Sequence, residues 1–156
     1  MVRFLSFCTA KVNPLKFFQN GFFFSIVKYE IEGHFLINFY FKATEKERNV
    51  ILHSDIREYF NSYWFLEMIG WIGNYNISLF PVTPGIEPHL FTNCVRDYLS
   101  LKKREEIYIP IGFESSGMLI LMNNRTGEIV IEDFETEECR YLSTNLKELI
   151  SEISFK

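Results

Sequence analysis

Cysteine is scarce in this chain, and its spacing is irregular. The 156 residues include only Cys8, Cys94 and Cys139, with no CxxC pair among them. An odd number of widely spaced cysteines is typical of reduced thiols, not of a disulfide framework or a zinc site. We therefore expect a protein of a reducing compartment, the cytoplasm.

Long apolar runs and ligand motifs are also absent. No stretch reaches the roughly 18 apolar residues of a transmembrane helix, and Lys11 interrupts the N-terminal apolar run too early for a signal peptide. His34, His53 and His89 form no metal-binding pair, and neither GxGxxG nor GxxxxGK[ST] occurs. The basic residues are too scattered for a nucleic-acid stripe. We expect no membrane, nucleic-acid, metal or cofactor partner.

The sequence offers little for catalysis. His89 and Cys94 stand five residues apart in a proline-rich region, with no motif to orient them as base and nucleophile. The lack of such a motif favours a binding protein over an enzyme. A small enzyme whose site is assembled from scattered residues such as His89, Cys94 and Glu114 is the alternative.

Apolar and aromatic residues are abundant instead. Hydrophobic residues make up 47% and charged residues 23% of the chain, a balance that excludes a disordered protein. Aromatic residues reach 17%, with 17 phenylalanines, which predicts a phenylalanine-rich core. The length is that of one domain, spanning residues 1–156.

Residues 107–133 carry the clearest local signals. Three apolar runs alternate with two segments of turn residues, and the second turn segment begins with Asn and ends with Gly. The runs span residues 107–113, 118–122 and 128–132, and the turns residues 114–117 and 123–127. This pattern predicts a three-stranded antiparallel meander. No internal repeat is evident.

The flanking segments predict further strands and helices. In the N-terminal part we expect a strand over 2–12 ended by Asn13 and Pro14, a hairpin of 22–31 with 34–42, and a capping box of Thr44 and Glu47. A helix is predicted over 56–69, capped by Asp55 with Glu58 and stopped by Gly70 and Gly73, and a short helix over 93–101. An exposed charged lead over 102–106, a strand at 141–142 and a closing helix capped by Asn145 with Glu148 are expected in the C-terminal part. The fold class is α+β: a single domain, mainly antiparallel sheet with a central three-stranded meander, packed by a few helices including a C-terminal one.

Charge is distributed unevenly along the chain. Residues 1–48 carry a net charge of +3, whereas residues 128–138 carry −6 with no Lys or Arg. The acidic residues of this second segment are Glu128, Glu132, Asp133, Glu135, Glu137 and Glu138. A solvated strand end is one interpretation. The other is a docking surface for a basic partner, because clustered carboxylates steer association.

The meander and the closing helix resemble the SUKH superfamily of bacterial immunity proteins, and in particular its fourth immunity subfamily. The resemblance covers roughly residues 65–153 and leaves residues 1–42 unplaced. It rests on the strand segments 77–81, 108–112, 117–121 and 126–130 with its Thr-Gly-Glu turn, and on residues 141–150, which lead into the last helix.

The resemblance implies an α+β domain that binds and neutralises a cognate polymorphic toxin, without catalysis. The acidic segment suits a toxin domain with a basic surface. A non-catalytic protein-binding scaffold of phage or viral origin is the alternative within this fold.

Overall fold

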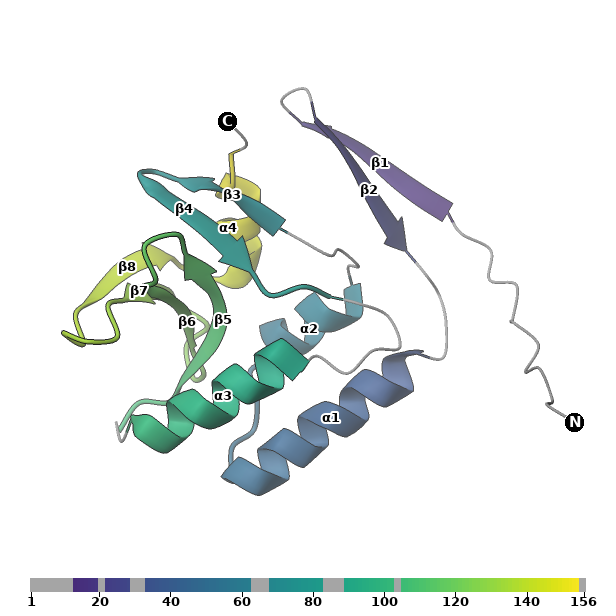
Figure 1. Cartoon of the computed structure of the whole chain (residues 1–156). Helices are drawn as coiled ribbons and strands as arrows, with labels where there is room; N and C mark the ends of the chain where they lie inside the picture. The colour runs from purple at the N-terminus through teal and green to yellow at the C-terminus, as the bar shows by residue number, and fades with distance from the viewer. Residues whose placement is uncertain are drawn as a thin grey trace, which may run out of the picture.

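The computed structural model describes residues 13–19, 22–28, 33–62, 68–82, 89–102 and 105–154. Helices and strands alternate irregularly along the chain, as expected of an α+β domain (Figure 1). In order, they are β1 Asn13–Gln19, β2 Phe22–Lys28, α1 Gly33–Arg48, α2 Ser54–Ser62, β3 Met68–Ile72, β4 Tyr75–Leu79, α3 His89–Leu101, β5 Tyr108–Glu114, β6 Leu119–Asn123, β7 Ile129–Glu132, β8 Cys139–Ser143 and α4 Leu146–Glu152.

Six strands form one antiparallel sheet in sequence order, β3 to β8, and β1 and β2 form a separate hairpin. The larger sheet is curled, and α3 packs on β5 while α1 packs on α2 and α3. The helix α4 contacts β8 and α2. The predicted fold class is confirmed.

The central meander has the predicted strands. β5, β6 and β7 are paired in sequence order, and nearly all of their side chains are buried. The register of β5 against β6 shifts between Pro110 and Gly112. A proline has no N–H for a ladder hydrogen bond, so a β-bulge is where it is tolerated inside a sheet.

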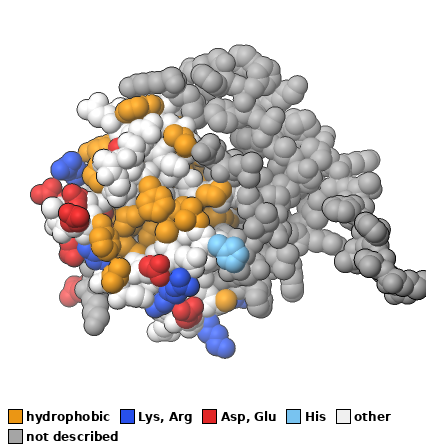
Figure 2. Space-filling model, viewed as in Figure 1, with side chains coloured by type: hydrophobic (Ala, Val, Ile, Leu, Met, Phe, Trp, Pro, Cys, Tyr) orange, Lys and Arg blue, Asp and Glu red, His pale blue; other side chains and the backbone are white. Residues whose placement is uncertain are grey.

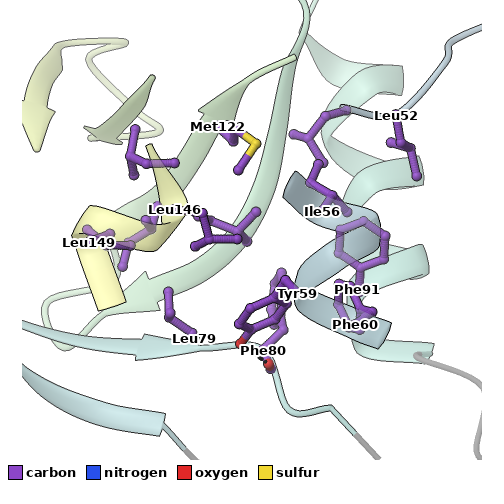
Figure 3. Close-up of a cluster of buried hydrophobic side chains, with 14 of the residues drawn as sticks. Leu52, Ile56, Tyr59, Phe60, Leu79, Phe80, Phe91, Met122, Leu146 and Leu149 are labelled. Carbon is purple, nitrogen blue, oxygen red and sulfur yellow. Dashed lines mark hydrogen bonds between the residues drawn. The ribbon is translucent and has the colours of Figure 1, made fainter. Parts of the chain in front are cut away.

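The main core lies between the curled sheet and the helices (Figure 3). Phe41, Phe60, Phe80 and Phe91 are fully buried, and the rings of Phe60 and Phe91 lie 4.8 Å apart. Phe41 and Phe80 also pack against Phe91, so one aromatic cluster joins α1, α2, α3 and the end of β4. The phenylalanine-rich core that composition predicts is therefore present.

The predicted strand over residues 34–42 is wrong, because this segment belongs to α1. Its apolar residues are nearly continuous, and such a run satisfies the period of a strand and that of a helix equally well. The spacing of Ile37 and Phe41, four residues apart, is also the spacing of neighbours on one helix face. Of the strand predicted over 22–31, residues 22–28 form β2, whose partner is β1, and residues 29–31 lie outside the described residues.

The predicted capping box of Thr44 and Glu47 is also wrong, since both residues lie inside α1. Thr44 is buried one turn after Phe41, on the helix side that faces the core. The helix ends at Arg48. The next residue, Asn49, has a positive φ of 52°, a common conformation for asparagine directly after a helix.

The helix predicted over residues 56–69 is shorter and begins earlier. Ser54–Ser62 forms α2, with Asp55 in its first turn and the N–H of Asp55 donating to His53 Nδ1. Ile69 and Gly70 lie in β3, and Gly73 occupies the β3–β4 turn with a φ of +56°. Gly70 and Gly73 therefore belong to a β-hairpin and do not end the helix. The apolar residues change from the period of a helix to that of a strand before these glycines.

Two other expectations concern the N-terminal region. The strand over residues 2–12 lies outside the described residues. Asn13 and Pro14, predicted to end that strand, instead begin β1. Proline is compatible with the first residues of a strand, so it marks a strand start as readily as a strand end.

The C-terminal elements agree with the sequence. β8 includes residues 141 and 142, α3 covers the helix predicted over 93–101, and β4 covers residues 77–79 of the strand segment at 77–81. Asn145 caps α4, where its Oδ1 accepts from the N–H of Glu148 at 2.9 Å. Leu146 and Leu149 then enter the core.

Candidate docking surface at the end of the sheet

The predicted acidic residues lie around the β7–β8 hairpin. Figure 2 shows carboxylates along the left edge of the molecule, where β7 and β8 lie in Figure 1. Glu128 directly precedes β7, Glu132 ends it, and residues 133–138 form the loop to β8. All of these carboxylates except that of Glu128 therefore belong to the last residue of β7 or to the six-residue loop that follows it.

Glu132 does not belong to this surface, because its side chain is 0% exposed. One carboxylate oxygen accepts a hydrogen bond of 2.6 Å from the Tyr98 hydroxyl, and the other lies 3.5 Å from Lys102 Nζ. A buried carboxylate needs such partners to offset the loss of hydration. Glu132 therefore has a structural position, and the docking role of the other five residues stays a prediction.

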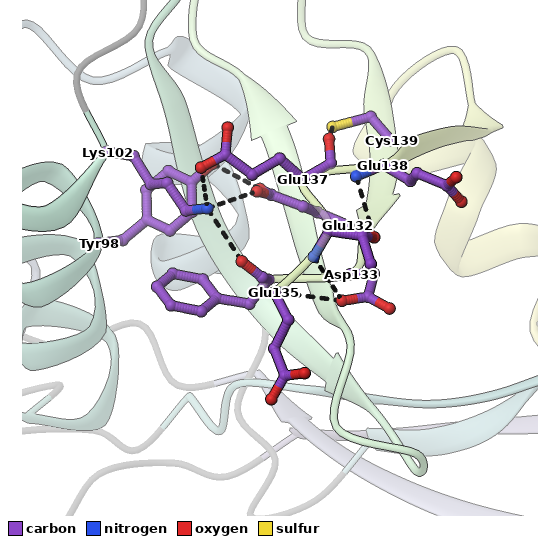
Figure 4. Close-up of polar contacts among 10 residues, drawn as sticks. Tyr98, Lys102, Glu132, Asp133, Glu135, Glu137, Glu138 and Cys139 are labelled. Carbon is purple, nitrogen blue, oxygen red and sulfur yellow. Dashed lines mark hydrogen bonds and ion pairs between the residues drawn. The ribbon is translucent and has the colours of Figure 1, made fainter.

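Lys102 holds the β7–β8 loop against the end of α3 (Figure 4). Its Nζ donates to the Phe134 carbonyl at 3.0 Å and to Glu137 Oε1 at 2.7 Å, and lies 4.2 Å from the centroid of the Phe134 ring. The Lys102 side chain is 8% exposed, so the prediction that it belongs to an exposed lead is wrong. Tyr98 and Lys102 stand four residues apart at the end of α3, a spacing that places two side chains on the same side of a helix. This spacing is the sequence signal that both could contact one group, here Glu132.

The loop itself has a defined backbone conformation. Asp133 Oδ1 accepts from the N–H groups of Glu135 and Thr136, and the Asp133 carbonyl accepts from the N–H of Glu137. The Asp133 N–H donates to the Glu138 carbonyl at 3.0 Å. These bonds hold Glu135 and Glu138 in place at the tip of the hairpin, where both are exposed.

The loop between β6 and β7 has the same hydrogen bonds, ten residues earlier. Asn123 takes the place of Asp133: its Oδ1 accepts from the second and third following N–H groups, and its own N–H donates to the Glu128 carbonyl. Gly127, with a φ of +79°, takes the place of Glu137, with a φ of +61°. A six-residue pattern therefore recurs, although the sequence showed no evident repeat.

The two loops differ in what they hold. In the first, Asn124 Oδ1 accepts from the N–H of His53 and its amide donates to the Ile51 carbonyl, so the loop fastens the α1–α2 connection. The second fastens the end of α3 through Lys102. The first loop is thus held against the α1–α2 connection and the second against the end of α3, and the tips of both loops are exposed.

Tyr141, in the middle of β8, is 59% exposed. The remaining burial of its hydroxyl, and then the negative charges of Glu148, Glu128 and Glu152, raise the pKa of Tyr141 above its ordinary value. Three carboxylates, one just before β7 and two in α4, therefore act on the Tyr141 hydroxyl through their charge. Sequence analysis did not predict the contribution of α4, since the loop and the helix are separated along the chain.

The residues of the alternative enzyme hypothesis do not gather in a described hollow. One groove of about 640 Å³ lies between α2 and α4 and includes Asp55 and Ile150, and another of about 360 Å³ lies between the ends of α1 and α3. Neither is lined by His89, Cys94 or Glu114. Burial, and then the charge of Asp97, raise the pKa of the Cys94 thiol, which disfavours the nucleophilic thiolate.

Glu114 has a structural role at the end of β5. Its carboxylate accepts from the Ser116 N–H at 2.7 Å and from the hydroxyls of Ser115 and Ser116. Burial acts most strongly and in the direction of a higher pKa, but the hydrogen bonds from Ser116, Ser115 and the Asn76 backbone outweigh it, so the pKa of Glu114 is lowered from 4.5. The carboxylate therefore stabilises the β5–β6 turn in its charged form.

We expect a Glu114→Gln variant to lose stability at neutral pH and to resemble the native protein in acid. Because the folded protein lowers the pKa of Glu114, its stabilisation is complete above the ordinary value of 4.5 and is lost as the pH falls through the lower folded value. Urea unfolding between about pH 7 and about pH 3 measures the difference, with Glu105→Gln as the control for loss of one exposed charge. A difference that grows toward acid would contradict this role.

Neither a cluster of metal ligands nor a membrane-spanning helix is found among the described residues. Among them, no three His, Cys, Asp or Glu side chains gather as the ligands of a metal ion. No helix in the same part of the chain has the length and apolar character needed to cross a membrane.

No model of a known protein family matches the chain, and a search of the curated proteins also found no match. The site is therefore interpreted from its own geometry.

Proposed function

We propose that this chain is an immunity-type binding protein that neutralises a cognate polymorphic toxin in the cytoplasm by direct protein–protein binding. The observation that carries the proposal is the exposed acidic tip of the β7–β8 hairpin, which is held against α3 by Lys102. A rigid acidic surface favours association with a basic partner, because its charges need no rearrangement before contact.

The family resemblance supports the same function. The segments on which it rests are regular elements of the structure: β4, the β5–β7 meander, β8 and the Asn145-capped α4. A SUKH-like immunity protein binds its toxin without catalysis.

The charge of the C-terminal part indicates the kind of partner. Residues 105–154 contain eleven acidic and three basic side chains, a net charge of −8. Arg140 pairs with Glu138 at 3.3 Å and Lys102 with Glu137 at 2.7 Å, whereas Glu135 has no Lys or Arg partner within the described part of the chain. A toxin domain with a basic surface is complementary to this region.

Reversal of the tip charges tests the acidic surface. We expect Glu135→Lys with Glu138→Lys to lower the association rate with the toxin by about tenfold or more at low ionic strength, and to remove most of its salt dependence. Glu137 is left unchanged because it holds Lys102. Stopped-flow or surface-plasmon measurements at several salt concentrations give the rates.

The matched control is Glu47→Lys with Glu58→Lys. These exposed residues of α1 and α2 give the same change in net charge away from the hairpin. The toxin is obtained by co-purification from the native host and is identified by growth arrest that co-expression of this chain relieves. Equal association rates for the two double variants would exclude the acidic tip as the docking surface, and a partner that is not neutralised would exclude the immunity function.

A further inference from the structure

We propose that the free edge of β8 accepts an extended, basic segment of the partner as a seventh strand of the sheet, with hydrogen bonds to the backbone of Tyr141. This inference rests on the proposed function, because it states how the partner is held. It adds main-chain pairing to the charge complementarity of the acidic tip.

The two edges of the sheet differ in their protection. At the β3 edge, Trp71 and Ser154 form a bridge with two backbone hydrogen bonds of 2.7 and 2.9 Å. At the other edge, β8 is the last strand, and no strand of the described chain pairs with its outer side. Arg140 and Tyr141 are exposed. An edge strand of this kind offers N–H and C=O groups to another chain.

The register shows which backbone groups point outward. Asp133 donates its N–H to Glu138, so these two residues form a hydrogen-bonded pair. In an antiparallel ladder such pairs alternate with non-hydrogen-bonded pairs. Two steps further, Ile131 and Arg140 are again hydrogen-bonded, and Val130 and Tyr141 are not; the register shifts only after this pair, between Val130 and Ile129. The N–H and C=O of Tyr141 are therefore directed away from β7, toward the open edge.

The neighbouring charges identify the incoming segment as basic. Glu128, Glu148 and Glu152 act electrostatically on Tyr141, and Glu138 lies in the adjoining loop. A second copy of this chain would place the same carboxylates against one another, which is unfavourable for directly opposed strands. A segment that alternates Lys or Arg with apolar residues would pair its charges with these groups and one apolar side chain with the Tyr141 ring.

Amide hydrogen exchange with a blocked peptide of four Lys-Val repeats tests this geometry. In the native chain we expect the peptide to slow exchange of the Tyr141 amide by at least about tenfold, because this amide gains a hydrogen bond. Exchange at Arg140, already bonded to β7, is expected to change little. The control peptide has the same charges but an N-methyl group on every residue, which removes the N–H donors and places methyl groups along both edges of the peptide strand.

The possible outcomes separate the alternatives. Protection of Tyr141 by the first peptide alone supports strand addition. Equal effects of both peptides indicate binding by charge only, no protection by either indicates a closed edge, and a Tyr141 amide already protected in a dimer of the free chain indicates a second copy in its place. Each of these three results would overturn the proposal.

A proline variant links the test to the toxin. Tyr141→Pro removes only an N–H that β7 does not use, and proline is tolerated on an edge strand. Compared with Tyr141→Val, we expect at least about a tenfold loss of toxin affinity. If Tyr141→Pro binds and neutralises the toxin as Tyr141→Val does, strand addition is wrong while the immunity function stands. The two peptides report on the native chain even if the proline variant does not fold.

Discussion

Replacement of Glu132 by alanine is expected to lower the free energy of unfolding by about 3 to 5 kcal/mol. Glu132 is fully buried, and its carboxylate interacts with the Tyr98 hydroxyl and the Lys102 ammonium. Its removal leaves the 8%-exposed Lys102 side chain with fewer compensating contacts and creates a cavity between α3 and β7. Urea denaturation followed by fluorescence measures the loss.

A double-mutant cycle separates the charge pair from its surroundings. Lys102→Met keeps an unbranched apolar side chain but removes the cation, and Glu132→Gln keeps a group that can accept from Tyr98. We expect each single variant to be destabilised, and the double variant to be more stable than the sum of the two losses predicts, by about 1 kcal/mol or more. Additive losses would show that Lys102 and Glu132 act independently.

The cycle also concerns function, because Lys102 holds the proposed docking loop. In Lys102→Met the loop loses its contacts with Nζ at the Phe134 carbonyl and at Glu137. Amide exchange in the loop is expected to accelerate together with the loss of stability. Unchanged exchange there would mean that the hydrogen bonds of Asp133 suffice to order the loop.

Replacement of Gly112 by alanine is expected to destabilise the protein by about 3 kcal/mol or more. A Cβ at this position would lie 2.3 Å from the Ser78 carbonyl oxygen and 3.0 Å from the Cα of Leu79. Both are backbone atoms of β4, which pairs with β5 at this point, so neither can rotate away. The two strands would have to separate, at the cost of ladder hydrogen bonds.

The matched variant is Gly117→Ala, in the turn that follows β5. Its φ of +98° strains any L-residue, but nothing lies within 4 Å of the new Cβ. We expect a loss of about 1 to 2 kcal/mol, because only backbone strain is involved. Thermal unfolding of both variants compares the two causes; a larger loss for Gly117→Ala would contradict the contact with Ser78. An insoluble Gly112→Ala protein would agree with the expectation if Gly117→Ala is soluble.

Secondary structure could be predicted where the apolar residues of a segment follow the period of a strand or of a helix, but not of both. In residues 107–153, turn residues such as Gly117 and Gly127 and the Asn145 cap separate short apolar runs, so strands and helix are predicted correctly. In residues 34–42 the apolar residues are almost continuous, and the same letters fit a strand or a helix. There the choice is made by packing, which places Phe41 beside Phe60 and Phe91.

The acidic segment illustrates the same limit for the candidate site. Its composition predicts a cluster of six carboxylates, but only the fold brings Lys102 to Glu132 and Glu137, and only the strand order leaves Tyr141 at an edge. The partners of Glu132 lie 34 and 30 residues earlier in the chain, at Tyr98 and Lys102. No local pattern relates residues at such separations.

The sequence by itself determined the α+β class, the central meander, the capped closing helix and the concentration of negative charge after Glu128. These properties depend on neighbours along the chain: turn chemistry, strand alternation and helix capping. Only the tertiary structure decided that α1 is a helix, that Glu132 is buried beside Lys102, and that none of the described strands covers the outer edge of β8. Burial and pairing depend on residues distant in sequence, and these are brought together only by the packing of the whole domain.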